Sequence, residues 1–385
     1  MHIGLNLVYL TPGATGGTET YARELIPQLV AAAPQHRFTA FVNRDTAGTE
    51  GPWNDLIGHV AVPVSALNRV QWVRGEQQLL PRLAQRAGVE LLHSLANTAP
   101  AWGRFHRVVT IHDLIYFVVP EARQGLRAKG MRVLLPLAAR RSDRVIVDAT
   151  ATAEDLRRRV GIGSAKIDVV PLGVTTPPPG VTATPAGRLR RQLDAGDRPI
   201  VLSVSAKLPH KNLPRLLAAL ALIPAGIRPL LVLPGYPTPH EDELRRRAQQ
   251  LGVSDDVRLL GWVSREELEG LYAVAACFVF PSLYEGFGLP VLEAMARGVP
   301  VACSGRGALI EVAGDAAARF DPESEPAIAA AVQEVLALDP AQAEARRAAG
   351  RAHAARFSWR ATAEQTLASY HRAVGGSPGA AQIPS

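Results

Sequence analysis

The architecture of this chain is indicated most clearly by residues 281–293, Pro281-Ser282-Leu283-Tyr284-Glu285-Gly286-Phe287-Gly288-Leu289-Pro290-Val291-Leu292-Glu293. An apolar run from Cys277 to Phe280 precedes them and is typical of a buried parallel strand. Pro290 marks the first turn of a helix that Gly298 would end. A strand that passes through a glycine-containing loop into a helix is the repeating unit of a parallel sheet covered by helices.

The loop between this strand and helix has the features of a site for a ligand that carries hydroxyl groups and phosphate. Gly286 and Gly288 let a backbone approach a ligand closely, and free N–H groups at the helix start favour an anion. The carboxylates of Glu285 and Glu293 can accept hydrogen bonds from hydroxyl groups, as an acidic residue does from a ribose diol in dinucleotide-binding folds. These features indicate a nucleotide sugar. The structural alternative for Glu293 is that it complements the dipole of its helix.

Two other positions lie at the carboxyl ends of predicted strands, where open parallel sheets bind ligands. Gly16 and Gly17 follow the first strand and precede a helix, which is a phosphate-binding geometry, although two glycines also form ordinary tight turns. Lys211 follows the strand Ile200–Ser205, and its ammonium group can neutralise a diphosphate leaving group. The alternative for Lys211 is a solvated surface lysine.

A histidine and an aspartate close another predicted strand, Val108–Ile111. His112 can hydrogen-bond a hydroxyl group of the sugar. Asp113 can fix the tautomer of His112, or it can bind the acceptor, which is the molecule that would receive the sugar. The alternative is a structural His–Asp pair that satisfies a buried strand end. His93 and Asn97, which follow a further strand, are additional candidates for contact with the acceptor.

Residues 281–294, Pro-Ser-x-x-Glu-Gly-Phe-Gly-Leu-Pro-x-x-Glu-Ala, resemble the signature of family 4 glycosyltransferases. The resemblance implies a retaining enzyme of the GT-B fold that uses a nucleotide-sugar donor. It extends over nearly the whole chain, because three further segments match the family's other motifs: Gly16-Gly17-Thr18-Glu19, Thr110-Ile111-His112-Asp113 and His210-Lys211-Asn212. The implied fold is α/β, with two doubly wound Rossmann-like domains facing a cleft.

The resemblance also implies roles for individual residues. It places Glu285 and His112 beside the donor sugar as catalytic residues, and Glu293 at the ribose. Lys211 would bind the diphosphate and support departure of the leaving group. Backbone N–H groups that contact sugar hydroxyls or phosphate are expected from Gly286, Phe287, Gly288 and Leu289.

One departure from the family pattern concerns the second phosphate-binding cation. The family usually carries an arginine five residues before its lysine, but this chain has Ala206 at that position. The next residue, Lys207, is the expected substitute for donor binding. Its alternative is again a solvated surface lysine.

Two ways of retaining configuration are open for Glu285. A covalent nucleophile is one of them, but glycosidase chemistry needs two carboxylates across the scissile bond, and Glu293 is expected at the ribose. We therefore favour front-side displacement, in which the departing phosphate helps to take the acceptor proton. Glu285 would then orient the sugar and stabilise positive charge at its ring.

The length of 385 residues favours two domains, since one hydrophobic core rarely serves so long a chain. We expect an N-terminal acceptor-binding domain over residues 1–174 and a Pro-rich linker over 175–197. A nucleotide-sugar-binding domain would then follow over 198–357. The resemblance implies that a last helix, about 358–374, packs back on the N-terminal domain.

Composition adds expectations about location and partners. The first residues read as a strand rather than a signal peptide, and the two cysteines lie in predicted buried strands, so a cytoplasmic protein is expected. The net charge is +7, and no nucleic-acid-binding motif accompanies it. Seven basic residues lie between Arg123 and Arg144 among apolar ones, which fits either the outer surface of a core helix or peripheral contact with the inner membrane face. No Asp-x-Asp motif or His/Cys cluster occurs, so neither a metal nor a cofactor is expected.

These observations predict a metal-independent hexosyltransferase that acts on a glycan, lipid-linked or small-molecule acceptor. The residue sequences of the His112 and Lys211 motifs are most similar to those of the mannosyltransferase-like group. GDP-mannose is therefore the first choice of donor and a UDP-hexose the second. Two other classes stay open: a nucleotide-sugar epimerase of the same fold, and a catalytically silent sugar-binding protein.

Overall fold

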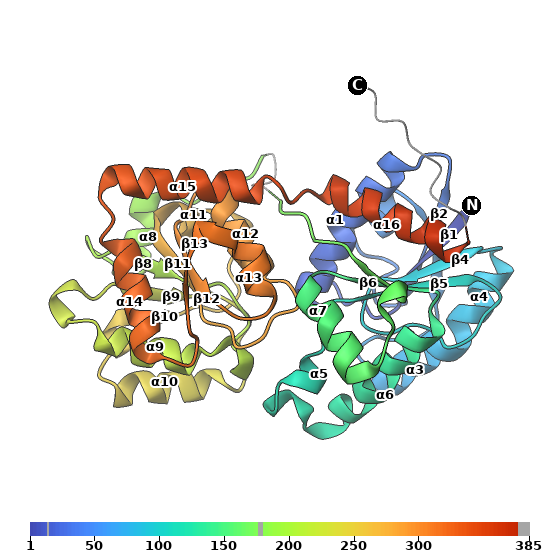
Figure 1. Cartoon of the computed structure of the whole chain (residues 1–385), viewed down its shortest axis with the longest axis horizontal. Helices are drawn as coiled ribbons and strands as arrows, with labels where there is room; N and C mark the ends of the chain where they lie inside the picture. Colours follow the sequence, from blue (N-terminus) through green and yellow to red (C-terminus); the bar gives the residue numbers. More distant parts are fainter. Residues whose placement is uncertain (14, 176–179, 376–385) are drawn as a thin grey trace. The chain divides into compact units, whose positions relative to one another are not determined.

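A computed structural model describes residues 1–13, 15–175 and 180–375 of the chain. The chain forms two compact units, one built from residues 1–173 with the C-terminal helix and one from residues 174–357 (Figure 1). Each unit contains its own parallel β-sheet and the helices that cover it. This confirms the predicted α/β class with two Rossmann-like domains.

The first unit has a seven-stranded sheet in the order β3-β2-β1-β4-β5-β6-β7. All neighbouring strands pair in parallel. Every side chain of β1 is buried, as expected for a strand that is covered on both faces. The strands are β1 (His2–Leu7), β2 (Arg37–Asn43), β3 (Gly58–Val62), β4 (Leu91–Ser94), β5 (His106–Ile111), β6 (Arg144–Val147) and β7 (Ile167–Val169).

The connecting helices of the first unit are α1 (Gly17–Ala32), α2 (Pro52–Asp55), α3 (Arg69–Arg74), α4 (Leu80–Arg86), α5 (Ile115–Val118), α6 (Gly125–Arg141) and α7 (Thr150–Asp155). A π-helical turn, Gly75–Leu79, joins α3 to α4, and a second, Leu156–Val160, follows α7. The last helix, α16 (Trp359–Ala373), begins at Ser358, whose hydroxyl accepts a hydrogen bond from Ala361 N at 3.2 Å. It packs against α1 and belongs to the first unit.

The second unit has a six-stranded parallel sheet in the order β10-β9-β8-β11-β12-β13. Its strands are β8 (Ile200–Leu202), β9 (Leu230–Leu233), β10 (Val257–Leu259), β11 (Ala275–Phe280), β12 (Val301–Ser304) and β13 (Ala317–Phe320). Its helices are α8 (Ala186–Gln192), α9 (Leu213–Leu222), α10 (Glu241–Gln250), α11 (Arg265–Val274), α12 (Leu289–Ala296), α13 (Ala308–Ala313), α14 (Glu325–Leu336) and α15 (Pro340–Ala354).

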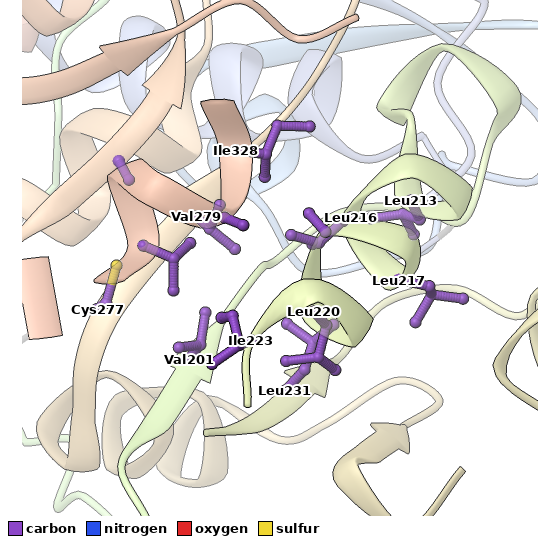
Figure 2. Packing of buried hydrophobic residues seen from close by; sticks show 14 of the residues in the cluster. Val201, Leu213, Leu216, Leu217, Leu220, Ile223, Leu231, Cys277, Val279 and Ile328 are labelled. Carbon is purple, nitrogen blue, oxygen red and sulfur yellow. The ribbon is translucent and has the colours of Figure 1, made fainter. Parts of the chain in front are cut away.

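The core of the second unit follows from the helical spacing of leucines. In α9, Leu213, Leu216, Leu217 and Leu220 recur at the i, i+3, i+4 and i+7 positions of one helix face. Figure 2 shows these side chains with Val201, Leu231 and Val279 of the sheet and with Ile328 of α14. This packing fixes the strands whose carboxyl ends carry most of the expected ligand-binding residues.

Part of the interval expected as a linker, 175–197, is a helix. Leu189 of α8 is buried, and a side chain added at Gly270 of α11 would come within 2.5 Å of Leu189 Cδ1, so the two helices pack closely. Residues 176–179 of that interval lie outside the described residues. In the part of the chain that the structure describes, no helix has both the length and the apolar composition that crossing a membrane requires.

Candidate functional site

The clearest charged pair at a strand end is Lys211 with Glu285, in the second unit. Lys211 Nζ lies 2.6 Å from Glu285 Oε1 and 5.3 Å from the ring centroid of Phe280. The two side chains are 15% and 13% exposed. A hydrogen bond from Leu283 N to His210 O, 2.9 Å long, joins the loops after β8 and β11 that carry them. The structure thus brings together two residues that lie 74 positions apart in the chain.

Asn212 explains why the loop after β8 has its shape. Its backbone is left-handed, with φ of 61°, a conformation that asparagine tolerates better than most residues. Its side-chain amide donates to Pro281 O at 3.0 Å and to Pro322 O at 2.7 Å. The Lys-Asn pair therefore combines a cation for a ligand with an amide that holds the loop.

The electrostatic balance around Glu285 favours its ionised form. Burial alone would raise the pKa of this carboxyl, but the charges of Lys211 and His210 outweigh burial, and the pKa lies below its usual value of 4.5. The pair is therefore an ammonium and a carboxylate.

The glycine loop after β11 is held by packing as well as by its conformation. Gly288 has φ of +110° and immediately precedes α12, and a Cβ at this position would lie 2.4 Å from Leu309 Cδ2. The side chain of Phe287 is buried, with its ring centroid 6.1 Å from that of Phe357. The side chain of Phe287 is therefore not accessible to a ligand, and the expected contact through its backbone N–H stays a prediction.

Glu293 lies one turn into α12, beside a network of charged and aromatic side chains. The hydroxyl of Tyr272 donates to Glu293 Oε2 at 3.4 Å. Arg297, one turn further along, forms a bidentate pair with Glu269 at 2.7 and 2.5 Å and stacks on Tyr272 at 4.9 Å. These contacts orient α12 against α11 and position the Glu293 carboxylate.

Lys207 does not lie where a donor-binding cation is expected. Its side chain is fully buried, and Nζ donates to Gly235 O at 3.0 Å and to Leu260 O at 2.6 Å. Its ion pair with Glu241, at 3.2 Å, completes a set of contacts inside the second unit. Because the ammonium group is committed to these partners, Lys207 acts as a structural link between three loops.

In the first unit, both ring nitrogens of His112 have partners. Nδ1 lies 2.7 Å from Asp148 Oδ2, and Nε2 lies 2.9 Å from Leu95 O. The backbone N–H of His112 donates to Asn97 Oδ1 at 2.8 Å. Burial lowers the pKa of His112, but the Asp148 carboxylate outweighs burial and raises it overall. Asp113 was expected either to fix the tautomer of His112 or to bind the acceptor; the carboxylate at Nδ1 is that of Asp148, and the acceptor role of Asp113 stays a prediction.

The acid that pairs with His112 follows the neighbouring strand. Asp148 comes directly after β6, which pairs with β5 in parallel, so the two strand ends are adjacent. An acid after the next strand of a parallel sheet is the signal that could have identified it. Asp113 instead accepts a hydrogen bond from Ile115 N at 3.0 Å, at the start of α5.

His93, expected as a contact for the acceptor, is bonded inside the first unit. It is fully buried, with Nδ1 2.7 Å from the Tyr370 hydroxyl and Nε2 2.8 Å from the Thr110 hydroxyl. Burial lowers its pKa to about 3, so the ring is neutral. It joins α16 to the centre of the sheet, which leaves neither nitrogen available for a sugar.

Gly16 and Gly17 lie at the start of α1. Gly16 has φ of +58°, a backbone conformation that favours glycine, and precedes the first helical residue. A Cβ at Gly17 would meet no atom of the described residues within 4 Å, so the space beside this backbone is open. The geometry is compatible with close approach of a phosphate.

The comparisons with known proteins agree with this arrangement. Residues 15–177 match the family described as Glycosyltransferase Family 4, and residues 187–353 match the family described as Glycosyl transferases group 1. The chain is 33% identical over 267 residues to O-antigen chain mannosyltransferase B of Escherichia coli. The matched region covers 68% of this chain and 69% of the relative.

Two solved structures share the fold over nearly the whole chain. Sucrose-phosphate synthase from Thermosynechococcus elongatus superposes with a TM-score of 0.78 and 25% identity, covering 98% of this chain and 100% of that one. An Anabaena protein solved with UDP-glucose superposes with a TM-score of 0.73 and 21% identity, covering 96% and 99%. Two Rossmann-like units with these matches define a glycosyltransferase of the GT-B fold. The chain belongs to family 4 of these enzymes, with mannosyltransferases among its relatives.

Proposed function

We propose that this glycosyltransferase moves a mannosyl group, with retention of configuration, from a nucleoside diphosphate sugar to an acceptor hydroxyl. The observation that carries the proposal is the Lys211–Glu285 pair at the carboxyl edge of the second sheet. Its ammonium group suits a diphosphate, and its carboxylate suits a sugar ring that becomes positively charged. The adjacent start of α12 adds backbone donors for an anion.

The residues divide the reaction between them. As the bond between the sugar C1 and the diphosphate oxygen breaks, Lys211 stabilises the charge that develops on the leaving group. The acceptor oxygen bonds to C1 on the same face, and the acceptor proton passes to the departing phosphate. Glu285 stabilises the oxocarbenium-like ring, and Glu293 accepts hydrogen bonds from the ribose. This division requires neither a protein nucleophile nor a metal ion.

The donor is proposed from the relatives as well as from the site. Mannosyltransferases occur among the relatives, and one structural neighbour was solved with UDP-glucose. We infer from these names that the donor of this chain is a nucleoside diphosphate hexose. We place GDP-mannose ahead of UDP-hexoses.

The test combines donor binding with the stereochemistry of the product. Thermal shifts with GDP-mannose, GDP-glucose, UDP-glucose and UDP-galactose should rank the donors, because a ligand stabilises in proportion to its binding. NMR of the glycoside formed should show the anomeric configuration of the donor. Inversion would contradict the mechanism, and epimerised sugar in the absence of any acceptor would favour the epimerase.

We also propose that α6 contacts an anionic membrane surface that presents the acceptor. Leu126 and Val133 are seven residues apart, so they share one helix face, and they are 83% and 66% exposed. The helix contains no acidic residue, and its exposed cations flank this face: Arg127, Lys129 and Arg132. Basic side chains around exposed apolar ones suit the interface of an anionic bilayer.

Vesicle sedimentation tests this contact. The wild type should bind phosphatidylglycerol vesicles more strongly than phosphatidylcholine vesicles, and a Leu126→Ser/Val133→Ser variant should lose most of this binding. Ile227→Ser is the matched control, since Ile227 is 63% exposed in the other unit. Equal binding by all three proteins would contradict the assignment.

A further inference from the structure

An aromatic pair, with Trp262 exposed and Tyr236 partly buried, lies at the carboxyl ends of two neighbouring strands in the second unit. Tyr236 follows β9 and Trp262 follows β10, and these strands pair in parallel. The two rings are stacked, with centroids 4.5 Å apart and an interplanar angle of 29°. The side chain of Trp262 is 69% exposed although it is large and apolar. Open parallel sheets bind ligands at this edge.

The loops that carry the aromatic pair are fixed by internal contacts. Lys207 Nζ donates to the carbonyl oxygens of Gly235 and Leu260, which lie one and two residues before the aromatic residues. Gly235 N also donates to Gly261 O at 3.2 Å. A Cβ at Gly235 would lie 1.9 Å from Ser205 O, so only glycine permits this close approach of the loops. The buried lysine therefore holds both aromatic residues in place before any ligand binds.

We propose that Tyr236 and Trp262 form a stacking platform for the nucleobase of the donor, and that the platform favours a purine. This inference rests on the proposed function, since it concerns the base of the same donor. A planar base can stack on an aromatic ring whatever its hydrogen-bonding pattern, and removal of one such ring typically weakens binding about 5- to 100-fold. A two-ring purine overlaps an indole more fully than a one-ring pyrimidine does. Stacking on Trp262 should therefore contribute more to the affinity for GDP than to the affinity for UDP.

The strand order agrees with the dimensions of a nucleotide. The order β10-β9-β8-β11 puts Trp262 on one strand end and Glu285 on another, with two strands between them. Three strand spacings amount to about 14 Å. An extended nucleoside diphosphate reaches over a similar distance from its base to its terminal phosphate. Lys211 follows β8, between these two ends, where the phosphates would pass.

The connection to the ribose residue supports the same path. Helix α11 begins directly after the Trp262 loop, with Ser264 as its cap. Its Tyr272 donates to Glu293, the carboxylate expected at the ribose. A base on the platform would thus lie on the element that also orients the ribose contact.

The experiment compares three ligands on three proteins. Isothermal titration of GDP, UDP and inorganic pyrophosphate should be carried out on the wild type, Trp262→Ala and Trp262→Phe. Trp262→Ala should lower the affinity for GDP about 5- to 100-fold. It should lower the affinity for UDP less and leave the affinity for pyrophosphate unchanged. Trp262→Phe should recover part of the GDP affinity. Trp102→Ala removes a 43% exposed tryptophan from the other unit and should change none of these affinities.

The outcomes separate the platform from the proposed function. If the wild type binds GDP and UDP but Trp262→Ala binds them equally well, the platform is overturned and the transferase proposal stands. Equal losses for GDP and pyrophosphate would also overturn the platform, because the effect would not concern the base. A wild type that binds neither nucleotide would overturn the proposed function itself. If Trp262→Ala bound an acceptor glycan more weakly but bound nucleotides as the wild type does, the nucleobase platform would be overturned and the aromatic pair would be assigned to the acceptor.

Discussion

At the carboxyl edge of the six-stranded sheet, Lys211 and Glu285 form an ion pair whose side chains are 15% and 13% exposed. The corresponding edge of the seven-stranded sheet carries His112 with Asp148, which is 2% exposed, and the fully buried His93. Both nitrogens of each histidine already have partners within the first unit. Redirecting such a group to a ligand costs the hydrogen bond that it leaves. The two edges therefore differ in their contacts: the second unit has a partly exposed ion pair, and the first has histidines whose ring nitrogens are bonded within the unit.

The same contrast separates two lysines that lie four positions apart. Lys211 is partly exposed and paired with a single carboxylate, whereas Lys207 is fully buried with two carbonyl oxygens and Glu241 around it. A cation is available for catalysis only if its partners leave room for a substrate. Lys211 meets this condition, and Lys207 does not.

The largest expected effect is that of Lys211→Ala. The substitution should lower kcat/KM by about 30- to 1000-fold, which corresponds to about 2–4 kcal/mol for losing one preorganised charged contact in the transition state. Some stability should be lost as well, because Glu285 loses the cation with which it pairs, so turnover is compared at a temperature at which both proteins are folded. Steady-state kinetics with varied GDP-mannose measure the effect. Near-normal turnover at saturating donor would show that the exposed pair has no catalytic role.

Lys207→Met is the matched control for this comparison. Removing the buried ammonium leaves two carbonyl groups without their donor and Glu241 with Arg245 as its remaining cation, so stability should fall by about 3 kcal/mol. The value of kcat at saturating donor should stay near that of the wild type. If Lys207→Met lost kcat without losing stability, the distinction between the two lysines would be wrong.

A smaller effect should divide the two glutamates. Glu293→Ala should raise the donor KM about 10- to 100-fold with little change in kcat, because contacts with the ribose are the same in the ground and transition states. Glu285→Gln should mainly lower kcat, since its charge acts on the developing oxocarbenium ion. Parallel measurements of KM and kcat for both variants are needed. If Glu293→Ala lost kcat with unchanged donor affinity, Glu293 rather than Glu285 would be the residue that acts on the developing oxocarbenium ion.

The sequence predicts the second unit better than the first for a physical reason. Strand β11, the glycine loop and helix α12 follow one another within residues 275–296, so one window contains the signals for all three. The capping box of Ser264 and Glu267 is likewise local, and it is present at the start of α11. Periodicity and capping act over a few residues, and the sequence displays them directly.

Side-chain direction at strand ends could not be predicted in the same way. Lys207 turns inward because carbonyl oxygens 28 and 53 residues away receive its hydrogen bonds. His93 bonds to Tyr370, 277 residues further along the chain. The helical segment from Arg69 to Arg86 is interrupted by the π-helical turn Gly75–Leu79. Such features depend on tertiary contacts that no local pattern encodes.

The structural network of the first unit should respond to pH at Asp168. Its carboxylate accepts hydrogen bonds from Arg144 at 2.9 Å and from Ser369 of α16 at 2.7 Å, and it pairs with Arg372 at 2.9 Å. Burial would raise the pKa of Asp168, but these partners outweigh burial, and the pKa lies below its usual value of 3.8. Its contribution to stability is therefore present above pH 3.8 and is lost as the pH falls through the lower folded value.

Asp168→Asn tests this assignment. At neutral pH the variant should be about 1.5–3 kcal/mol less stable, the usual value of hydrogen bonds to a charged group. The difference from the wild type should shrink as the pH falls below 3.8, where the wild-type carboxyl takes up its proton. Urea unfolding at both pH values measures it. A constant difference would show that the charge of Asp168 does not contribute, and a change in kcat at neutral pH would place this residue nearer to catalysis than the comparison allows.

The smallest expected effect is that of a chelator. Lys211 and the N–H groups at the start of α12 provide positive charge for a diphosphate, which is the role that a divalent ion plays in other phosphate-transfer sites. Turnover should therefore be unchanged in excess EDTA, and added Mg²⁺ or Mn²⁺ should not raise it. The informative control is Lys211→Ala under the same conditions. If Mg²⁺ restored part of the activity of that variant but not of the wild type, the lysine would be confirmed as the charge that substitutes for a metal. The opposite result is that EDTA abolishes turnover of the wild type and a divalent ion restores it. That result would show that the second unit does not by itself supply the positive charge for the diphosphate leaving group, and the role given to Lys211 in the comparison of the two units would be wrong.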